Sequence, residues 1–275
     1  MSLADKSNYL IETKNQIKEA IKGKGVEVSD TDTFRSYANK IEEIKSGGNL
    51  TDNFSTNWET SNSYNMIIQK LTKEIPNSIL QEAFNNQAVI RLDQSFAYCQ
   101  NLQELDLSNC NTSSVNSMQN MCAGSNNLKK IFMRNLNLNN CNAINSAFSS
   151  LKVLQEIDFS GTDTSHISTF LNFCNTCSAL VRFKGILDVK SNTANIANIF
   201  GNCSNLEEVY IKNLNSSGLN LSGSPKLKKE CLVFLLENAI ATSSETRTIN
   251  MGPSNTAKLA PEELAVGTNK GYTIS

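Results

Sequence analysis

The sequence predicts an α/β solenoid built from five units of 26 residues, with short parallel strands on one face and short helices on the other. Three observations support this fold class: a leucine that recurs at a fixed interval, two apolar positions that follow it, and two more that precede it. A unit of this size cannot bury its apolar side chains alone. Stacking of the units therefore has to form one continuous core.

The recurring leucine comes every 26 residues without an insertion. It occupies positions Leu102, Leu128, Leu154, Leu180 and Leu206. The constant interval matters physically, because one inserted residue would put every later strand out of line with its neighbour. We therefore expect the five units to stack in register.

The positions three and five residues after each leucine are apolar, which predicts a short strand with one buried face. The nearer position holds Leu105, Ile131, Ile157, Phe183 and Val209. The farther position holds Leu107, Met133, Phe159, Gly185 and Ile211. Gly185 is a poor match, because glycine brings no side chain to a core. The resulting L-x-x-L-x-L pattern is the signature of a leucine-rich repeat.

The positions ten and six residues before each leucine are also apolar, and their separation of four residues predicts one face of a short helix. Asn and Asp recur in the loop that follows each strand. They occupy Asn111, Asn137, Asp163 and Asn215, with Val189 as the exception. Their side chains are expected to bond turn backbone groups that no strand ladder reaches.

Apolar segments on both sides of the repeats are expected to cap the core. We predict a helical hairpin, a linker with the amino-terminal cap, the repeats, and a carboxy-terminal cap. Their bounds are 1–48, 49–88, 89–215 and 216–275. Within the last region the pattern predicts a helix over 226–241, a strand over 246–251 and a last helical turn or two from Pro261.

The predicted hairpin of residues 1–48 carries an apolar stripe on each of its two helices, the first ending at Gly23-x-Gly25. A hairpin of this size is too small for a good core of its own. It is expected to pack against a second copy or another protein, and so to serve attachment or oligomerisation. The alternative is that it folds back on the solenoid.

No catalytic, cofactor-binding or metal-binding residue is expected. Cys174-x-x-Cys177 has the spacing of a redox or zinc half-site, but that spacing follows from the repeat, and thiols in core positions act as small apolar groups. Eight unpaired cysteines favour folding in a reducing compartment. The only histidine, His166, falls in a loop, so Ser–His and Cys–His catalysis lack a candidate. An enzyme is the least supported class.

Composition argues against two kinds of partner. The formal net charge of -1 gives no general attraction to nucleic acid. No apolar run approaches the ~20 residues that a membrane helix needs, so membrane insertion is not expected.

The outward-facing strand positions form two columns. The first alternates in sign without exception: Glu104, Lys130, Glu156, Arg182 and Glu208. Neighbouring strands lie ~4.8 Å apart, so this column is expected to be a charge ladder that fixes the register of the repeats. The second column mixes aromatic and charged residues: Asp106, Phe132, Asp158, Lys184 and Tyr210. Register does not require such a mixture, and aromatics are favoured at contact surfaces, so this column is the candidate partner-binding site.

The string LDLSNCNTSSVNSM, residues 105–118, resembles the BspA-like leucine-rich repeat family of bacterial surface proteins. The resemblance covers residues 89–215 and weakens in the fourth unit, between Leu180 and Asn195. It implies the repeat fold and, more broadly, a role at a surface or in adhesion.

Both ends of the chain carry a second resemblance. Residues 8–44 are similar to the amino-terminal module of phage and prophage tail-associated proteins, and AKLAPEELAVGTNKGYTIS, residues 257–275, is similar to an end module of the same proteins. The two resemblances imply a non-enzymatic protein of the phage virion, present in the bacterial cytoplasm before assembly, whose solenoid binds a protein or glycan on a cell surface. The alternative is a BspA-like adhesin on the bacterial cell surface, with a signal sequence that was trimmed.

Overall fold

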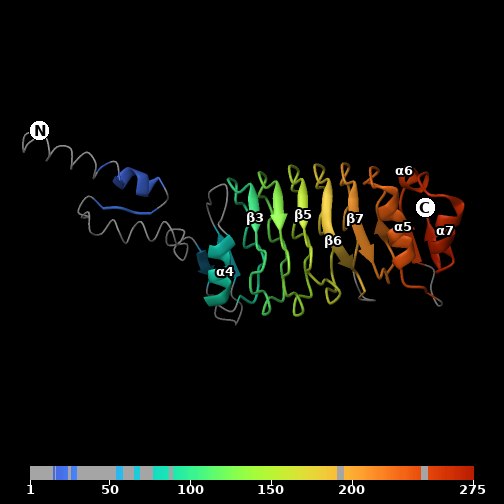
Figure 1. Cartoon of the computed structure of the whole chain (residues 1–275), viewed down its shortest axis with the longest axis horizontal. Coiled ribbons are helices and arrows are strands. Elements are labelled where there is room, and N and C mark those ends of the chain that lie inside the picture. Colours follow the sequence, from blue (N-terminus) through green and yellow to red (C-terminus); the bar gives the residue numbers. More distant parts are fainter. Residues whose placement is uncertain are drawn as a thin grey trace, which may run out of the picture. The chain divides into compact units, whose positions relative to one another are not determined.

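The computed structural model describes residues 15, 17–23, 26–29, 54–57, 65–68, 77–86, 89–190, 195–242 and 247–275. The chain forms two compact units, Met1–Phe54 and Ser55–Ser275 (Figure 1). Most of the described residues belong to the second unit, which carries the predicted repeats.

The first unit contains a helix over residues 17–22 that ends at Gly23, as the sequence predicts. The amide of Gly23 donates to the carbonyl of Glu19 at 2.8 Å and closes the last turn. Ile21 is buried with Val26 and Val28 of the extended segment that follows. The second predicted helix lies outside the described residues, so the hairpin stays a prediction.

The second unit is built on a parallel sheet of five strands in the order β3-β4-β5-β6-β7 (Figure 1). The strands are β3 (Glu104–Asp106), β4 (Lys130–Phe132), β5 (Glu156–Asp158), β6 (Arg182–Asp188) and β7 (Glu208–Lys212). From β3 to β6 every residue pairs with the residue 26 positions later. This register confirms that the strand positions lie side by side as the interval predicts.

A second ladder with the same interval runs through the segments that precede the strands. Its parallel bridges join Arg91, Ser117, Ala143, Thr169 and Asn195 in succession. Each 26-residue segment is thus paired with the next at two places. Two ladders with one interval hold the segments in register more firmly than the short strands would alone.

The prediction of short helices between these two ladders is wrong, because residues 93–98 and their counterparts form consecutive turns. Gln94 and Tyr98 have positive φ angles of 57° and 59°, which an α-helix does not accommodate. Alternate amides donate to the next segment, as when Phe96 donates to the carbonyl of Met121 at 2.9 Å. The separation of four residues between the two apolar positions therefore reflects two linked turns with a buried residue at each end.

The β6–β7 pairing departs from the interval. Arg182 pairs with Glu208, but Ile186 pairs with Tyr210, so β6 carries a bulge of two extra residues. The farther core position of this segment is therefore filled by the fully buried Leu187. This corrects the assignment of Gly185 to the core.

Gly185 instead occupies the bulge, with a φ of +97°. A Cβ there would lie 2.8 Å from the carbonyl carbon of Phe159, so only glycine fits. The interval of 26 residues is restored by the Thr169–Asn195 bridge. The bulge is therefore confined to one segment and does not displace the later ones.

The core of the second unit is continuous and rich in phenylalanine. Phe173 lies at its centre, with ring centroids 5.2 Å from Phe148 and 6.1 Å from Phe183. All eight cysteines are buried, and none of them forms a disulfide. Burial raises the pKa of the Cys99 thiol to about 11 and that of Cys203 to about 12. The thiols are therefore protonated at neutral pH.

The two shortest hydrogen bonds donated by these thiols reach carbonyls of the preceding segment, a role that the sequence did not suggest. The thiol of Cys177 donates to the carbonyl of Phe148 at 2.9 Å, and that of Cys203 donates to Cys174 at 3.0 Å. Ser125 holds the same position in an earlier segment and donates likewise, to Phe96 at 2.5 Å. Ser and Cys thus serve alike as the donor in three segments, whereas Leu151 fills the same position without donating.

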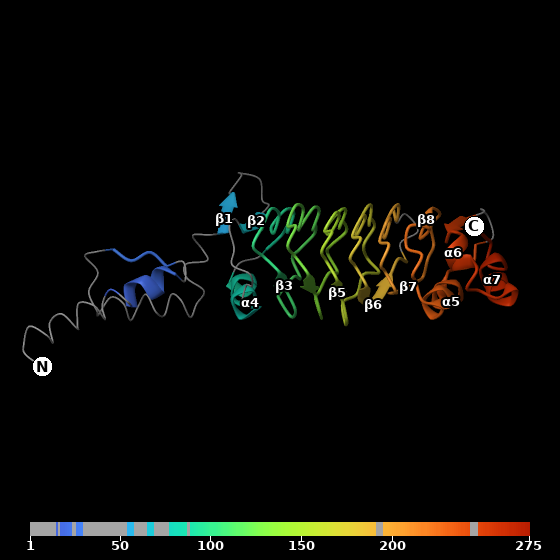
Figure 2. The ribbon, with the colours of Figure 1, turned by 90° about the horizontal axis from the view of Figure 1, so that it is seen from above.

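Further elements lie on either side of the five strands (Figure 2). Before them come β1 (Phe54–Asn57), β2 (Asn65–Ile68) and α4 (Asn77–Asn86). After them come β8 (Leu219–Asn220), α5 (Lys229–Asn238), β9 (Arg247–Asn250), α6 (Pro253–Thr256), α7 (Pro261–Thr268) and β10 (Tyr272–Ile274).

The carboxy-terminal elements confirm the helix predicted over 226–241, the strand predicted over 246–251 and the helical turns predicted from Pro261. The sequence did not predict β10, which joins β9 in a three-stranded parallel sheet. In the described part of the chain no helix is long and apolar enough to cross a membrane.

Candidate functional site

The alternating charge column is in register on the sheet. Glu104, Lys130, Glu156, Arg182 and Glu208 are successive backbone partners on the five strands. Within the described residues, one ion pair joins two members of this column, Glu156 and Arg182, whereas Glu208 pairs with Lys228 at 3.6 Å. The column is therefore a row of alternating charges with one strong contact near its middle.

Glu156 is the centre of that contact. Its Oε2 accepts from Arg182 Nη2 at 2.8 Å and its Oε1 from Lys184 Nζ at 2.9 Å. Burial by itself would raise the pKa of this carboxyl, but the hydrogen bonds from Lys184 and Arg182 outweigh it and lower the pKa. Glu156 is therefore a charged acceptor that two cations hold in place.

The mixed column has a different order from the predicted one. Asp106, Phe132, Asp158 and Lys184 are successive partners. Tyr210 pairs with Ile186 and not with Lys184, because the bulge inserts two residues into β6. An exposed isoleucine therefore stands where the interval of 26 residues placed the lysine.

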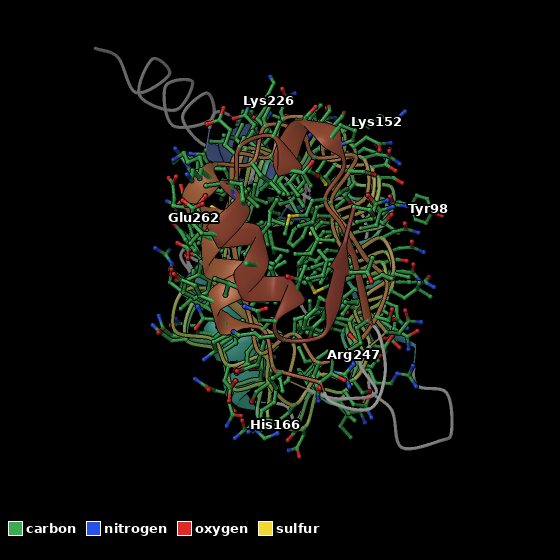
Figure 3. All side chains as sticks on the ribbon, turned by 90° about the vertical axis from the view of Figure 1, so that its right-hand side faces the viewer. Tyr98, Lys152, His166, Lys226, Arg247 and Glu262 are labelled. Atoms are coloured by element: carbon green, nitrogen blue, oxygen red, sulfur yellow. The ribbon has the colours of Figure 1, made fainter. Side chains whose placement is uncertain are left out.

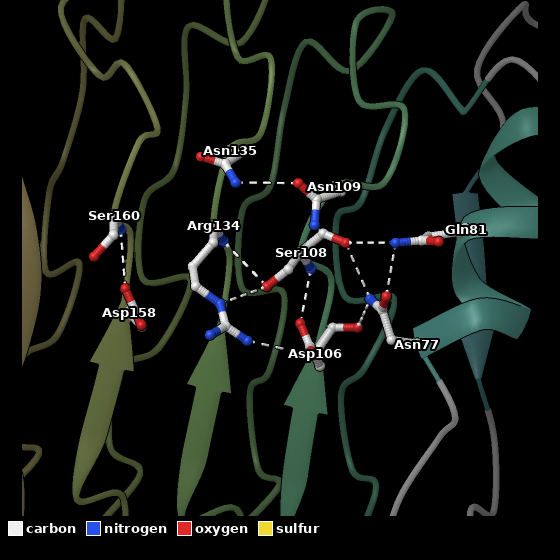
Figure 4. A network of polar contacts seen from close by, with 9 residues as sticks. All are labelled: Asn77, Gln81, Asp106, Ser108, Asn109, Arg134, Asn135, Asp158 and Ser160. Atoms are coloured by element: carbon white, nitrogen blue, oxygen red, sulfur yellow. Dashed lines mark hydrogen bonds and ion pairs between the residues drawn. The ribbon is translucent and has the colours of Figure 1, made fainter.

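Asp106 and Asp158 bond the chain that leaves their own strands (Figure 4). Asp106 Oδ1 accepts from the amide of Ser108 at 2.8 Å, and Asp158 Oδ1 accepts from the amide of Ser160 at 3.0 Å. Asp158 is only 6% exposed. Both carboxylates therefore satisfy local turns, which leaves them less able to bind a partner than predicted.

Asn111, Asn137 and Asp163 bond backbone groups in the same way, which confirms the predicted role of the loop column. The Oδ1 of Asn137, for example, accepts from the amide of Asn139 at 3.1 Å. Asn215 differs, since its side-chain oxygen accepts from Arg247.

Helix α4 is tied to the carboxyl end of β3 by side-chain amides (Figure 4). Asn77 Nδ2 donates to the carbonyl oxygens of Asp106 at 2.8 Å and Ser108 at 3.1 Å. Gln81 Nε2 adds a bond of 3.0 Å to Ser108. The strand face is therefore bounded by α4 on this side.

Phe132 and Tyr210 are each half-buried by a neighbour. The guanidinium carbon of Arg134 lies 4.8 Å from the centre of the Phe132 ring, and Arg134 also lies 3.6 Å from Asp106. The Tyr210 ring stands edge-on to Phe234 of α5, with centroids 5.3 Å apart. Tyr210 thus packs partly against the carboxy-terminal elements, whereas the Phe132 ring lies under Arg134, which Ser108 and Asp106 hold in place.

A groove of about 600 Å³ with both polar and apolar walls lies at the carboxyl ends of β5, β6 and β7. It is lined by the loop that follows β5, by the bulge of β6 and by the first residues after β7. Its walls include Asp163, Ile186, Asp188, Lys190, Lys212 and Asn213. The repeat pattern does not reveal this groove, because a fixed interval conceals a bulge. The available signal was the glycine at a core position with Leu187 two residues later.

The described residues contain no group of three or more His, Cys, Asp or Glu side chains placed to hold a metal ion. His166 lies at the surface of the second unit (Figure 3), with its Nε2 3.9 Å from Asp163. Ser165 also bonds Asp163, through its hydroxyl at 3.1 Å. Both residues therefore contact the same carboxylate in one tight turn, which is not the relay of a hydrolase, where histidine stands between the other two.

No family model matches the chain, and no match is found among characterised proteins or among solved structures.

Proposed function

We propose that the second unit is a leucine-rich-repeat solenoid of five 26-residue units and that the chain is a non-enzymatic binding protein. The observation that supports the proposal is the pair of ladders. The strands and the bridges that precede them both pair at an interval of 26 residues. Such stacking presents side chains from successive units in rows on one face. Rows of that kind suit the recognition of an extended surface.

The outward strand face is the proposed contact surface. Phe132 under Arg134 and Ile186 beside Tyr210 supply apolar area, and Lys184 and Arg182 supply positive charge held by Glu156. Arginine and aromatic side chains are enriched at protein interfaces. The surface is pre-organised, since these side chains already bond one another.

The chain is proposed to be a phage or prophage tail-associated protein that binds a protein or glycan on the host cell. The similarity of residues 8–44 and 257–275 to end modules of such proteins supports this assignment. The amino-terminal unit is proposed to attach the chain to another tail protein or to a second copy. Its separation from residues 55–275 as a compact unit is consistent with that role.

Two experiments test this function. Immunogold electron microscopy with an antibody to the second unit should label the tails of particles induced from the source strain. Fluorescent full-length protein should bind host cells, and the variant Phe132→Ala should bind them more weakly than the wild type. Unlabelled particles would contradict the tail assignment, and cells that bind neither protein would contradict surface recognition.

The second candidate is a BspA-like adhesin that binds host or matrix proteins. The string from Leu105 to Met118 favours it, since it resembles the repeats of that family. The complete gene and its neighbours separate the two candidates. Adjacent tail genes support the first, whereas a signal peptide or wall anchor supports the second.

A further inference from the structure

The bulge in β6 exposes an apolar side chain that the ladder does not require. Ile186 is 45% exposed, although it lies between the buried Leu187 and the bulge glycine Gly185. The other strands form the same ladder without extra residues. Bulges concentrate near functional sites, where they redirect a side chain. The bulge restricts position 185 to glycine and exposes Ile186, which indicates that the exposed Ile186 side chain has a function.

The polar groups beside Ile186 are fixed by neighbouring side chains and by a backbone amide. Asp188 Oδ2 accepts from Asn213 Nδ2 at 2.9 Å and lies 3.2 Å from Lys212 Nζ. Asp163 accepts from the amide of Ser165 at 2.9 Å. Groups held in this way lose little freedom when a ligand binds. The groove is therefore a built site with both acceptors and donors on its walls.

The charges of the groove balance. Its walls carry two carboxylates, Asp163 and Asp188, and two ammonium groups, Lys190 and Lys212. An anionic ligand would meet the carboxylates, and a cationic ligand would meet the lysines. A neutral ligand rich in hydroxyl groups can bond both kinds of wall at once.

We propose that this groove binds one or two rings of a neutral oligosaccharide, with the apolar face of a sugar ring on Ile186 and its hydroxyl groups toward Asp163, Asn213 and Lys190. The volume of about 600 Å³ is within the usual range of small-molecule sites. A protein partner fits less well, because protein hot spots centre on aromatic anchors and no aromatic residue lines this groove. The inference rests on the proposed function and names the class of ligand.

Saturation-transfer NMR on the full-length chain tests the proposal. The probes are the methyl glycosides of glucose, galactose, mannose and N-acetylglucosamine, with methyl glucuronide as the charged comparison. At least one neutral glycoside should receive saturation at its ring protons, and methyl glucuronide should receive less. In Ile186→Ser the affinity for that glycoside should fall roughly tenfold, since removing two carbons' worth of contact costs about 1.5 kcal/mol.

The matched control is Val153→Ser, which removes a similarly exposed apolar side chain (37%) outside the groove and should leave sugar binding unchanged. Melting curves establish that each variant folds. Should Ile186→Ser not fold, Lys190→Met takes its place, because Lys190 is exposed and only its backbone amide bonds Asp188.

The proposal is overturned if no neutral glycoside receives saturation at millimolar concentration, if methyl glucuronide binds better, or if the folded groove variant binds as well as the wild type. Failure of this proposal is distinguishable from failure of the proposed function. Wild-type protein that binds host cells but none of the sugars overturns only the groove. Sugar binding without cell binding overturns only the surface role.

Discussion

The hydroxyl of Thr164 bonds both backbone groups of Asp188, donating to its carbonyl oxygen at 3.1 Å and accepting from its amide at 2.8 Å. These two residues lie 24 positions apart, and Asp188 follows the bulge glycine Gly185 by three residues. One side chain thus completes the pairing that the bulge interrupts. Both residues are buried, so water cannot replace the bonds.

Replacing Thr164 with Val should therefore destabilise the second unit. The amide and carbonyl of Asp188 would be left buried without this partner, at a cost of roughly 2–3 kcal/mol. The control is Thr112→Val, whose buried hydroxyl makes a single bond of 2.9 Å, to the carbonyl of Asn137. It should cost about 1 kcal/mol. Urea denaturation measures both variants, and equal losses would contradict a special role for Thr164.

The central ion pairs predict a salt-dependent effect of Glu156. The variant Glu156→Lys should place like charges beside Lys130 and Arg182, which destabilises neighbouring strands by roughly 1 kcal/mol. High salt should reduce the loss. The variant Glu104→Gln on the edge strand should change stability by less than about 0.5 kcal/mol. If Glu156→Lys leaves the stability unchanged at low salt, the alternation of charges has no role in register.

The lowered pKa of Glu156 also predicts the acid side of the stability curve. Since the folded pKa lies below the ordinary value of 4.5, the carboxylate stabilises the fold above that value. The contribution is lost as the pH falls through the folded pKa. The variant Glu156→Gln should therefore lower stability at pH 7 and converge with the wild type in acid. Melting temperatures from pH 7 down to pH 3 measure this, and parallel curves would contradict it.

The strands are the part of the fold that the sequence predicts best. Periodic apolar positions placed β3, β4, β5 and β7 correctly, because burial on one face requires those residue types at that interval. The turns between the ladders were mistaken for helices. A separation of four buried residues is common to both, and only the positive φ angles distinguish them.

The candidate site was predictable in part. Register fixed the neighbours of Glu156, since a parallel ladder with a constant interval leaves no choice. It could not reveal that Asp106 and Asp158 cap turns, because that depends on side-chain rotamers at strand ends. The groove depends on the bulge at Gly185, a backbone feature that a constant interval averages away.

Two buried cysteines should respond differently to serine. Cys203 donates to the carbonyl of Cys174, as Ser125 does to Phe96 in its own segment, so Cys203→Ser keeps the bond and should cost less than about 1 kcal/mol. Cys174 donates no side-chain hydrogen bond within the described residues and is fully buried. Cys174→Ser should therefore cost about 1–3 kcal/mol, since its hydroxyl gains no partner. Urea denaturation in reducing buffer compares them, and a reversed order would contradict the donor role of this column.

The two aromatic residues of the mixed column should contribute differently to stability. Both were expected to face outward in that column, but Tyr210 packs edge-on against Phe234. Tyr210→Ala should therefore cost about 1–3 kcal/mol, from lost burial and the aromatic pair. Phe132→Ala should cost about 1 kcal/mol, because its ring contacts the exposed Arg134 side chain on one face.

Binding should follow the opposite order if the strand face is the contact surface. Phe132→Ala should weaken attachment to host cells, since it removes apolar area from the proposed contact surface together with the stacking partner of Arg134. The control Tyr210→Phe keeps the ring against Phe234 and should leave both stability and attachment close to the wild type. Thermal melts and cell-binding curves on the same preparations provide the test. Unchanged attachment by a stable Phe132→Ala would move the contact surface away from β4 and toward the groove beside Ile186.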